Sequence, residues 1–477
     1  MNTLAADSLP CLPQAVFHVA TLGCKINQYE TQSLREAWLG LGWLETDDPA
    51  QAAVVVVNSC AVTQRAVSDL RQAVRKLRRQ APEARLVVTG CAAQVLAKEL
   101  RDMAEVDCVV GQDRKDQLHE LLPYLAGESS LESREGSGET SGEASEEAPE
   151  SGPIQATTFP PFSIRDYQRA RAVLKIQDGC TRGCTYCIVP STRGASVSRE
   201  PRHIEAELAR LLDAGVREIT LSGINLRQFG RDFSPENNIQ DLWDLAAHLN
   251  ATFAPNWLGR ARLRISSLDP AQLTAKTLDV LAQSALLCPH LHVSLQSGSP
   301  AVLGRMNRSS TDPDGLLAFM HKLRSIWPLF GLGVDVICGF PGESDKDFSL
   351  TRDLMDALPL TYAHIFPFSP RPGTRAADMD GQVGKETKAE RAKELRELAQ
   401  AKKQGFLEQL TQVDRLTVAL EQQAPARGMC EYYVPCSFSN AQPEAAPREL
   451  TRARPLAVDE DTTGLHVAPL PGQGDEK

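Results

Sequence analysis

The sequence contains no apolar run long enough to span a membrane. Residues 1–7 also lack the basic region followed by an apolar stretch that is typical of a signal peptide. Both absences favour a cytoplasmic protein without a membrane partner, in a compartment that keeps thiols reduced. The chain nevertheless has twelve cysteines, so metal or redox chemistry is expected before disulfides.

With 477 residues, 42% of them hydrophobic, the chain is long enough for two or three globular domains. Its net charge of −10 is unevenly spread: residues 128–153 contain eight Glu and one Arg, a net charge of −7, which leaves about −3 for the rest of the chain. The segment 127–153 has almost no large apolar side chain, so it predicts a disordered acidic linker. The near-neutral remainder can carry basic patches.

Three cysteines after this linker have the spacing Cys-x3-Cys-x2-Cys: Cys180, Cys184 and Cys187. Three thiolates can hold a four-iron cluster and leave one iron without a protein ligand. The spacing is typical of radical S-adenosylmethionine (SAM) enzymes, in which SAM chelates the open iron and is cleaved to a 5′-deoxyadenosyl radical. A three-cysteine zinc site is the alternative, and it is disfavoured because no fourth Cys or His lies nearby at a typical zinc spacing.

Three cysteines before the linker share another pattern. Cys24, Cys60 and Cys91 each follow an apolar run, and helical patterns over residues 28–41, 66–80 and 92–103 fill the gaps. Alternating strands and helices predict a parallel sheet with helices on both faces, whose sites form at the carboxyl ends of the strands. We therefore interpret these cysteines as a second cluster site rather than three unrelated thiols. Cys108, in the middle of a fourth strand, is expected to be core packing.

Six strand-like runs alternate with helical patterns after the linker, which predicts a partial (β/α)6 barrel with function at the carboxyl ends of its strands. The runs span residues 172–177, 217–222, 263–267, 291–296, 333–338 and 362–366, and the helices lie near residues 202–214, 239–249, 272–286, 314–327 and 344–358. A helix over residues 386–410 follows. Short strand-like pieces at residues 416–420, 432–435 and 465–467 then predict a small β-barrel, so the fold class is α/β with a small β domain at its end.

With both cysteine sets, the chain resembles the radical-SAM methylthiotransferases over nearly its whole length outside the acidic linker. The run Lys25-Ile26-Asn27-Gln28-Tyr29-Glu30 after the first cysteine, together with residues 58–63, looks like the branch that acts on N6-threonylcarbamoyladenosine in transfer RNA. Further matching runs span residues 189–194, 221–225, 264–270, 294–298, 305–308, 339–343 and 368–374. The resemblance implies an N-terminal methylthiotransferase domain at 14–126, a linker at 127–160, a radical-SAM domain at 161–385, and a helix with a small RNA-binding (TRAM-like) β domain at 386–470.

The resemblance also implies a transferase that replaces the C2 hydrogen of the modified adenosine with a methylthio group. Its implied cofactors are SAM and two [4Fe-4S] clusters, one on Cys180, Cys184 and Cys187 and the other, which carries a sulfur, on the N-terminal cysteine set. Its implied partners are a tRNA substrate and an electron donor protein of the flavodoxin or ferredoxin type. The candidate SAM-contacting residues are Tyr186, Gly223, Asn225, Ser267 and Gln296. Packing or local backbone contacts are the alternative for Tyr186, Gly223, Ser267 and Gln296.

RNA binding needs cationic side chains for the phosphates. Three groups are candidates: Arg65, Arg71, Arg75, Lys76, Arg78 and Arg79 on one helix; Arg193, Arg199 and Arg202 beyond the cluster loop; and Arg427, Arg448, Arg452 and Arg454 in the tail. Arg193 and Arg199 are favoured because they flank the cluster loop, whereas a run of charges on one helix is usually a solvated face.

Three alternative functions stay open. Methylthiotransferases for isopentenyladenosine in tRNA or for a small-subunit ribosomal protein would share both cluster sites. The run after Cys24 argues against them, and the RNA-binding-like tail argues against the ribosomal-protein substrate. A non-catalytic iron–sulfur carrier is disfavoured by the SAM-type spacing and the six β/α units.

Overall fold

The computed structural model describes residues 15–118, 120, 158–439 and 443–471. The chain divides into two compact units, residues 1–154 and residues 155–477. Residues 127–157 of the predicted acidic linker lie outside the described residues. No helix in the described ranges has the length and apolar character needed to cross a bilayer.

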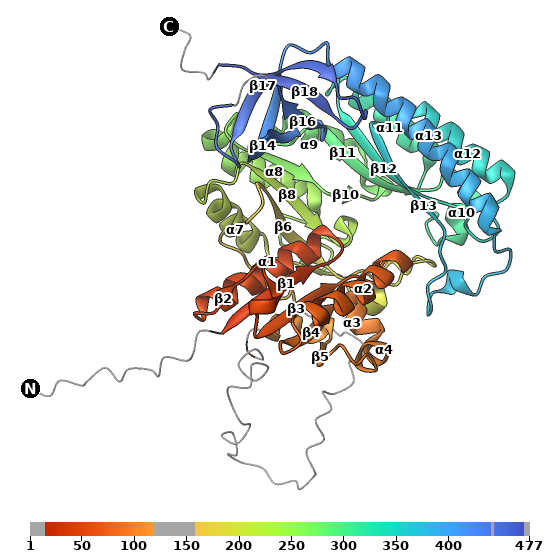
Figure 1. Cartoon of the computed structure of the whole chain (residues 1–477). Helices are drawn as coiled ribbons and strands as arrows, with labels where there is room; N and C mark the ends of the chain where they lie inside the picture. The colour runs from red at the N-terminus through yellow and green to blue at the C-terminus, as the bar shows by residue number, and fades with distance from the viewer. Residues whose placement is uncertain (1–14, 119, 121–157, 440–442, 472–477) are drawn as a thin grey trace, which may run out of the picture. The chain divides into compact units, whose positions relative to one another are not determined.

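The first unit contains a five-stranded parallel sheet in the order β2-β1-β3-β4-β5 (Figure 1). Its strands are β1 Val16–Thr21, β2 Leu44–Glu45, β3 Val54–Ser59, β4 Arg85–Gly90 and β5 Cys108–Val110. Its helices are α1 Lys25–Gly40, α2 Gln64–Gln80, α3 Cys91–Val95 and α4 Ala97–Arg101, with 3-10 turns η1 Pro49–Gln51 and η2 Gln112–Gln117. All six residues of β3 are buried, as expected for a strand covered on both faces.

The predicted sheet of this unit is confirmed, with two local differences. The short edge strand β2 adds a fifth strand that the sequence pattern did not indicate. The helix predicted over residues 92–103 is divided into α3 and α4, because Leu96 leaves the helical region at φ −122° and ψ 26°. Cys108 begins β5 and is half-buried, and burial raises the pKa of its thiol.

The second unit begins with the open barrel, built from two four-stranded sheets in the orders β7-β6-β8-β9 and β10-β11-β12-β13. Its strands are β6 Arg171–Asp178, β7 Val197–Ser198, β8 Glu218–Gly223, β9 Arg262–Ile265, β10 Ser267–Leu268, β11 His290–Gln296, β12 Gly331–Cys338 and β13 Tyr362–Pro367. The chain passes from one sheet to the other at Ser266, between β9 and β10. All these pairings are parallel except that of the short strand β7. The predicted partial (β/α)6 barrel is thus confirmed.

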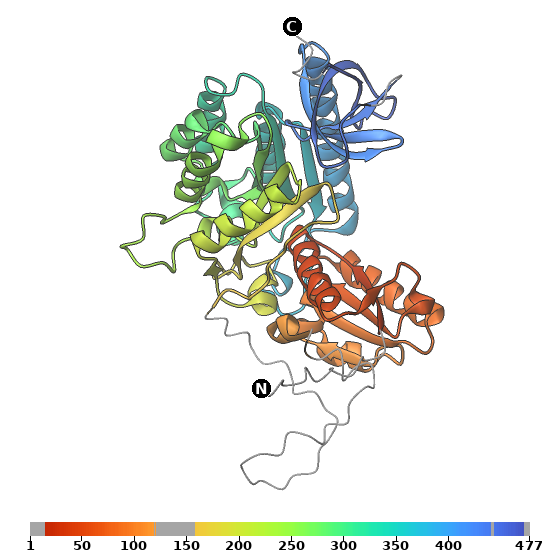
Figure 2. The same cartoon turned by 90° about the vertical axis from the view of Figure 1, so that its left-hand side faces the viewer.

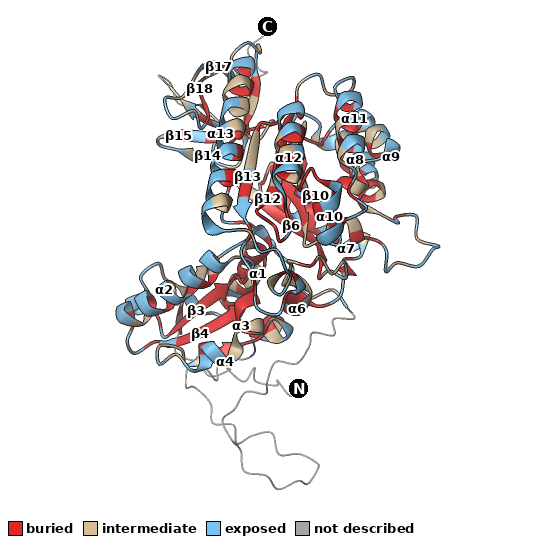
Figure 3. Cartoon of the chain, turned by 90° about the vertical axis from the view of Figure 1, so that its right-hand side faces the viewer, coloured by how far each residue is buried: buried red, intermediate tan, exposed pale blue. Residues whose placement is uncertain are grey.

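Most residues of β6, β8, β9, β11 and β12 are buried, the edge strand β13 is more exposed, and the helices carry exposed outer faces (Figure 3). The helices are α6 Val189–Arg193, α7 Pro201–Asp213, α8 Leu242–Trp257, α9 Ala275–Gln283, α10 Pro300–Arg305, α11 Pro313–Leu323 and α12 Asp345–Ala357, with 3-10 turns η3 Leu226–Gln228, η4 Pro270–Gln272 and η5 Arg375–Ala377. This arrangement leaves the opposite face of the sheets as the interior of the barrel.

A long helix, α13 Lys385–Leu410, packs along β13 and leads to a closed five-stranded barrel in the order β14-β15-β16-β18-β17 (Figure 2). Its strands are β14 Leu416–Gln423, β15 Ala426–Cys430, β16 Pro435–Phe438, β17 Leu450–Val458 and β18 Leu465–Pro469. The predicted small β-barrel is confirmed, but three of its strands, β15, β16 and β17, were missed. The strand predicted over residues 432–435 was wrong, because Tyr433 has φ 65° and belongs to the turn before β16.

Buried arginines join this small barrel to the open barrel. Glu218 on β8 is fully buried and forms ion pairs with Arg262 at 2.6 Å and Arg264 at 3.0 Å, both on β9. The same guanidinium groups donate to backbone oxygens of the small barrel, from Arg262 to Thr417 at 2.7 Å and from Arg264 to Glu431 at 3.1 Å. Burial opposes the charged form of Glu218, yet the two arginines hold its pKa well below the usual range.

Candidate active site

The cysteines Cys180, Cys184 and Cys187 lie on the loop between β6 and α6, and all three are half-buried. The loop leaves β6 through Gly179, where φ is +67° and a Cβ atom would overlap the carbonyl oxygen of Ala195. Only glycine satisfies both the left-handed backbone and this close approach. The Gln177 side chain fixes the same turn by donating to the carbonyl oxygens of Asp178 at 2.6 Å and Gly179 at 2.8 Å.

Two side chains direct N–H groups at the sulfur atoms of this loop. The Asn225 Nδ2 lies 3.3 Å from Cys180 Sγ, and an Arg308 guanidinium nitrogen lies 3.9 Å from Cys184 Sγ. N–H donors to cysteine sulfurs favour thiolates and tune iron–sulfur clusters. Burial raises the pKa of the Cys187 thiol to about 12, so iron has to displace a proton when it binds there. Three soft sulfur donors with N–H groups around them fit an iron–sulfur cluster.

Arg308 and Asp269 form an ion-pair network next to the cluster loop. An Arg308 nitrogen lies 3.0 Å from Asp269 Oδ2 and donates to the Ser294 carbonyl oxygen at 2.8 Å. Asp269 also pairs with Arg182 inside the loop and, at 3.6 Å, with Arg227. Sequence reasoning gave neither Arg308 nor Asp269 a role. Both lie in runs that carried the family resemblance, and that was the available signal.

Asn307 and Thr185 hold the loop from the other side. Asn307, in a left-handed conformation with φ 59°, donates to the carbonyl oxygens of Arg182 at 3.2 Å and Gly183 at 3.1 Å. Thr185 donates through its backbone N–H to Met306 at 3.2 Å. The segment after α10 thus acts as a rigid support for the cysteine loop, as a site that must hold a cofactor requires.

Four of the five predicted SAM-contacting residues lie at or just beyond the ends of the barrel strands β8, β10 and β11, and Tyr186 lies on the cysteine loop. Gly223 ends β8, and a Cβ there would lie 2.9 Å from the Gln177 side chain, so its small size serves packing against β6. Asn225 follows it and caps η3. Ser267 begins β10 and is exposed, whereas Gln296 ends β11, is buried and has φ 69°. Their contacts with SAM stay predictions.

Tyr186 packs edge-on against Phe340, with ring centroids 6.4 Å apart. It borders a small apolar cluster that includes Met306 and Phe368. Burial raises the pKa of its hydroxyl, which stays protonated at neutral pH. The structure thus gives Tyr186 the packing contacts of the alternative interpretation, and its contact with SAM stays a prediction.

In the first unit, Cys24, Cys60 and Cys91 follow the carboxyl ends of the neighbouring strands β1, β3 and β4. Ser59 pairs in register with Gly90, so Cys60 and Cys91 occupy the next position on adjacent strands. A Cβ on Gly23 would lie 2.5 Å from Cys60 Cβ, which places the turn before Cys24 against Cys60. The sheet therefore gathers the three cysteines at one edge.

Two asparagines of the matching runs hold this edge together. The Asn27 amide donates to the carbonyl oxygens of Leu22 and Ser59, both at 2.9 Å. The Asn58 amide donates to the Asn27 carbonyl oxygen at 3.0 Å and to the Thr31 hydroxyl at 2.9 Å. These bonds join the turns that follow β1 and β3, each of which ends in a cysteine. The asparagines thus have a positioning role that cysteine spacing alone did not reveal.

The prediction that Arg193 and Arg199 contact RNA was wrong. Arg193 is 3% exposed and pairs with Asp178 at 3.0 Å, and Arg199 is 5% exposed and pairs with Glu207 at 2.8 Å. Buried charges are held by partners of opposite charge. Arg193 thus supports the start of the cluster loop at Asp178, whereas Arg199 joins β6 to α7 through the Lys175 carbonyl oxygen and Glu207. Arg202, the third member of that group, is exposed.

The other two basic groups are partly neutralised. On α2, Arg71 pairs with Glu99 at 2.6 Å and Arg75 with Glu105 at 3.6 Å, whereas Lys76 and Arg79 are exposed. In the small barrel, Arg448 pairs with Asp166 at 2.7 Å, and Arg427 and Arg454 are exposed. RNA contacts of either group stay predictions.

Two family models match the chain. Residues 16–111 match an uncharacterized protein family, UPF0004, and residues 174–355 match the radical SAM superfamily. The chain is 34% identical over 431 residues to the threonylcarbamoyladenosine tRNA methylthiotransferase MtaB of Chlamydia pneumoniae. The aligned residues cover 89% of this chain and 92% of that relative. It is 33% identical over 405 residues to the tRNA-2-methylthio-N(6)-dimethylallyladenosine synthase of Agrobacterium fabrum, with 82% and 84% covered.

Among solved structures, the fold is similar to TsrM, a radical S-adenosylmethionine methyltransferase from Kitasatospora setae. The TM-score is 0.54 with 16% sequence identity, and the match covers 77% of this chain and 74% of TsrM. That similarity extends to the fold alone. The family is shown by the relatives and by the radical SAM match: the chain belongs to the radical-SAM methylthiotransferase family, whose enzymes use SAM and iron–sulfur clusters.

Proposed function

We propose that this protein inserts a methylthio group at C2 of N6-threonylcarbamoyladenosine next to the anticodon of tRNA. The observation that carries the proposal is the pair of three-cysteine sites, each at the carboxyl ends of parallel strands. The name of the Chlamydia relative, together with the run Lys25–Glu30, supports this substrate. A cytoplasmic location and a flavodoxin- or ferredoxin-type electron donor are parts of the same proposal.

The two cysteine sets have different roles in this proposal. Cys180, Cys184 and Cys187 would hold the cluster that supplies reducing power for SAM cleavage, and Cys24, Cys60 and Cys91 would hold a cluster that carries the sulfur. A radical reaction suits the C2–H bond, because no side chain is basic enough to deprotonate that aromatic position near neutral pH.

The surrounding residues of the chain prepare the SAM-cleaving site. Asn225 and Arg308 place N–H donors on the sulfurs of Cys180 and Cys184, which stabilises negative charge on the thiolates. Asp269 holds Arg308 in place and balances its charge inside the protein. The support from Asn307 fixes the loop, so the sulfur ligands keep their positions while SAM binds and leaves.

Substituting Cys24 by alanine separates the two roles. The Cys24→Ala enzyme should make no methylthiolated nucleoside, yet it should still convert SAM to 5′-deoxyadenosine under anaerobic, reducing conditions. The products are measured by mass spectrometry, with Cys108→Ala as the control that removes a thiol outside both sets. Normal product formation by Cys24→Ala would show that the N-terminal set does not serve the reaction.

The Agrobacterium relative favours a second candidate substrate, dimethylallyladenosine in tRNA, because its identity is nearly that of the Chlamydia relative. The purified enzyme can be offered three tRNA transcripts that differ only in the modification of the target adenosine: threonylcarbamoyl, dimethylallyl or none. Product on the first alone supports the proposal. Product on the second alone assigns the alternative, and product on neither, with SAM cleavage intact, favours a ribosomal-protein substrate.

A further inference from the structure

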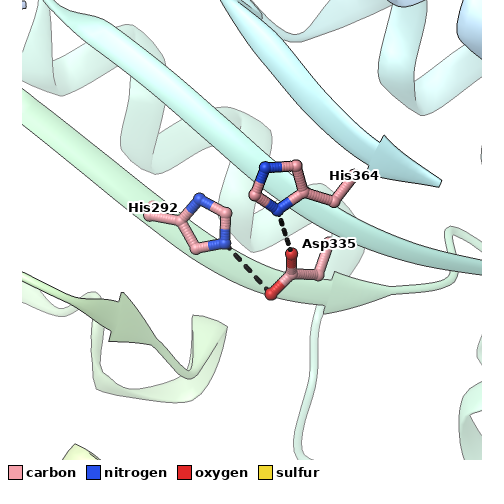
Figure 4. Close-up of side chains that lie close together, drawn as sticks. All are labelled: His292, Asp335 and His364. Atoms are coloured by element: carbon pink, nitrogen blue, oxygen red, sulfur yellow. Dashed lines mark hydrogen bonds and ion pairs between the residues drawn. The ribbon is translucent and has the colours of Figure 1, made fainter. Parts of the chain in front are cut away.

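Three side chains with metal-binding atoms lie together on neighbouring strands of the open barrel, two of them half-buried and one, that of His364, exposed. They are His292 on β11, Asp335 on β12 and His364 on β13 (Figure 4). Val293 and Val334, their neighbours on β11 and β12, are fully buried, whereas Ile337, two residues beyond Asp335 on the same face, packs against the apolar cluster that Tyr186 borders. Because side chains alternate along a strand, the three polar residues lie on the face opposite the two valines, toward the barrel interior.

The Asp335 carboxylate offers one oxygen atom to each histidine ring. His292 Nε2 lies 3.0 Å from Asp335 Oδ2, and His364 Nδ1 lies 3.1 Å from Asp335 Oδ1. One ligand atom from each residue falls within 4.8 Å of the other two. Two imidazole nitrogens and one carboxylate oxygen at this spacing can coordinate a single ion.

Within the described parts of the chain, the only ion pairs of Asp335 are those with the two histidines. Its side chain is 21% exposed and that of His292 is 12% exposed, so water screens this carboxylate only partly. Elsewhere in the interior the carboxylates of Glu218 and Asp269 are balanced by arginines. At Asp335 a bound cation would provide the balancing charge.

A tyrosine orients His292 from behind. The Tyr362 hydroxyl lies 2.9 Å from His292 Nδ1 and 3.0 Å from His290 Nε2. Tyr362 reaches across β12 because Gly333, which pairs with both His292 and Tyr362, has no side chain in the way; a Cβ there would overlap the tyrosine ring. A partner on the second ring nitrogen is what metal-binding histidines usually have, since it fixes the ring orientation.

We propose that His292 Nε2, Asp335 and His364 Nδ1 form a binding site for one divalent transition-metal ion of the zinc(II) or iron(II) class. Two imidazoles and one carboxylate suit such ions and leave coordination positions open for water or another small ligand. These nitrogen and oxygen donors make the site chemically distinct from the six cluster cysteines.

The site is close to the cluster loop along β11. Ser294 lies two residues beyond His292 on β11. Its carbonyl oxygen accepts a hydrogen bond from Arg308, which also contacts Cys184 Sγ. Two residues of strand correspond to about 7 Å. The inference stands on the side chains of the second unit alone and does not depend on which nucleoside is the substrate.

Zinc binding to the holoenzyme tests the proposal directly. Protein with both clusters loaded is treated with a chelator, its iron content is measured, and 65Zn(II) binding is followed by anaerobic equilibrium dialysis. One tightly bound equivalent of zinc is expected, without loss of iron. Asp335→Asn and His364→Ala should each weaken binding by at least about 100-fold. Tyr362→Phe should weaken it by about 10- to 100-fold, the usual cost of losing the hydrogen-bond partner of a metal-binding histidine.

The control is His248→Ala, which removes a histidine paired with Glu205 at 2.9 Å on a partly exposed surface; it should bind zinc like the unsubstituted enzyme. His364 is exposed, so its alanine variant should fold even if Asp335→Asn does not. Absence of a zinc equivalent in the unsubstituted holoenzyme would overturn the proposal. Equal zinc affinity in the His364→Ala and His248→Ala proteins would overturn it as well.

Discussion

The turn before Cys24 offers a way to disturb the N-terminal cysteine site without removing any thiol. Gly23 has φ +97°, and a Cβ atom built there would lie 2.5 Å from Cys60 Cβ and 2.9 Å from Cys60 Sγ. Non-bonded carbon atoms normally approach to about 3.5–4.0 Å, so in Gly23→Ala the two segments have to separate by about 1 Å. The left-handed backbone adds about 1–3 kcal/mol of strain.

Such a displacement is large for a metal site, where ligand distances are held to within about 0.2 Å. Cys60 is buried at the end of β3 and cannot move without disturbing the Asn27 and Asn58 bonds. We therefore expect Gly23→Ala to lose the N-terminal cluster. Iron should fall from about eight to about four atoms per chain, and methylthiolated product should disappear, whereas SAM cleavage should continue.

Anaerobic reconstitution followed by iron analysis and a 5′-deoxyadenosine assay measures both effects. Gly42→Ala is the matched control, because Gly42 also has a positive φ, +86°, but a Cβ built there would meet nothing within 4 Å. It introduces the strain without the clash and should keep all its iron. The reasoning would be refuted if Gly23→Ala retained the full iron content and normal product formation.

Two further predictions concern the second unit. Asn225→Ala removes the N–H donor to Cys180 Sγ. Because hydrogen bonds to charged groups contribute about 1.5–3 kcal/mol, SAM cleavage should slow by about 10-fold and the reduction potential of the cluster should become more negative, with the iron content unchanged. An unchanged reduction potential would contradict the assigned contact. Glu218→Gln leaves Arg262 and Arg264 buried without their carboxylate and should lower the free energy of unfolding of this unit by about 3–5 kcal/mol. By contrast, Arg71→Ala, which breaks a half-exposed ion pair with Glu99 in the first unit, should lower that unit's free energy of unfolding by at most about 1 kcal/mol. Equal losses in denaturant titrations of these two variants would refute the burial argument.

Much of the architecture follows from local sequence patterns. The run Val54–Val57 is apolar and β-branched because β3 is covered on both faces, and that pattern is visible in the chain alone. Cysteine is equally informative, since three thiols at three strand ends have few structural reasons to occur together. The fold and both cysteine sets could therefore be predicted without coordinates.

What the sequence did not reveal depends on contacts between distant residues. Charged residues are expected on the surface, so Arg193 was assigned to RNA and Arg308 to nothing, although each is buried against a carboxylate, Asp178 or Asp269. A charged side chain can be buried only where the fold brings a partner of opposite charge to it, and the sequence alone does not show which residues meet.

Two further features could not be predicted from the sequence because they depend on the folded geometry: the turn around Tyr433 and the group formed by His292, Asp335 and His364. Tyr433 stacks on His290 with ring centroids 4.8 Å apart, and its φ is positive. A residue with this φ does not continue a strand, although local propensity predicted one there. The histidine–aspartate group exists only because β11, β12 and β13 are adjacent in one register. Strand order and register are properties of the folded sheet.

The most direct test of the proposed reaction is mass spectrometry of nucleosides from total tRNA of cells with and without this gene. The account predicts that 2-methylthio-N6-threonylcarbamoyladenosine disappears from the deleted cells while its unthiolated precursor accumulates, and that the intact gene, but not the Cys180→Ala variant, restores it. An unchanged nucleoside profile in the deleted cells would contradict the proposed substrate.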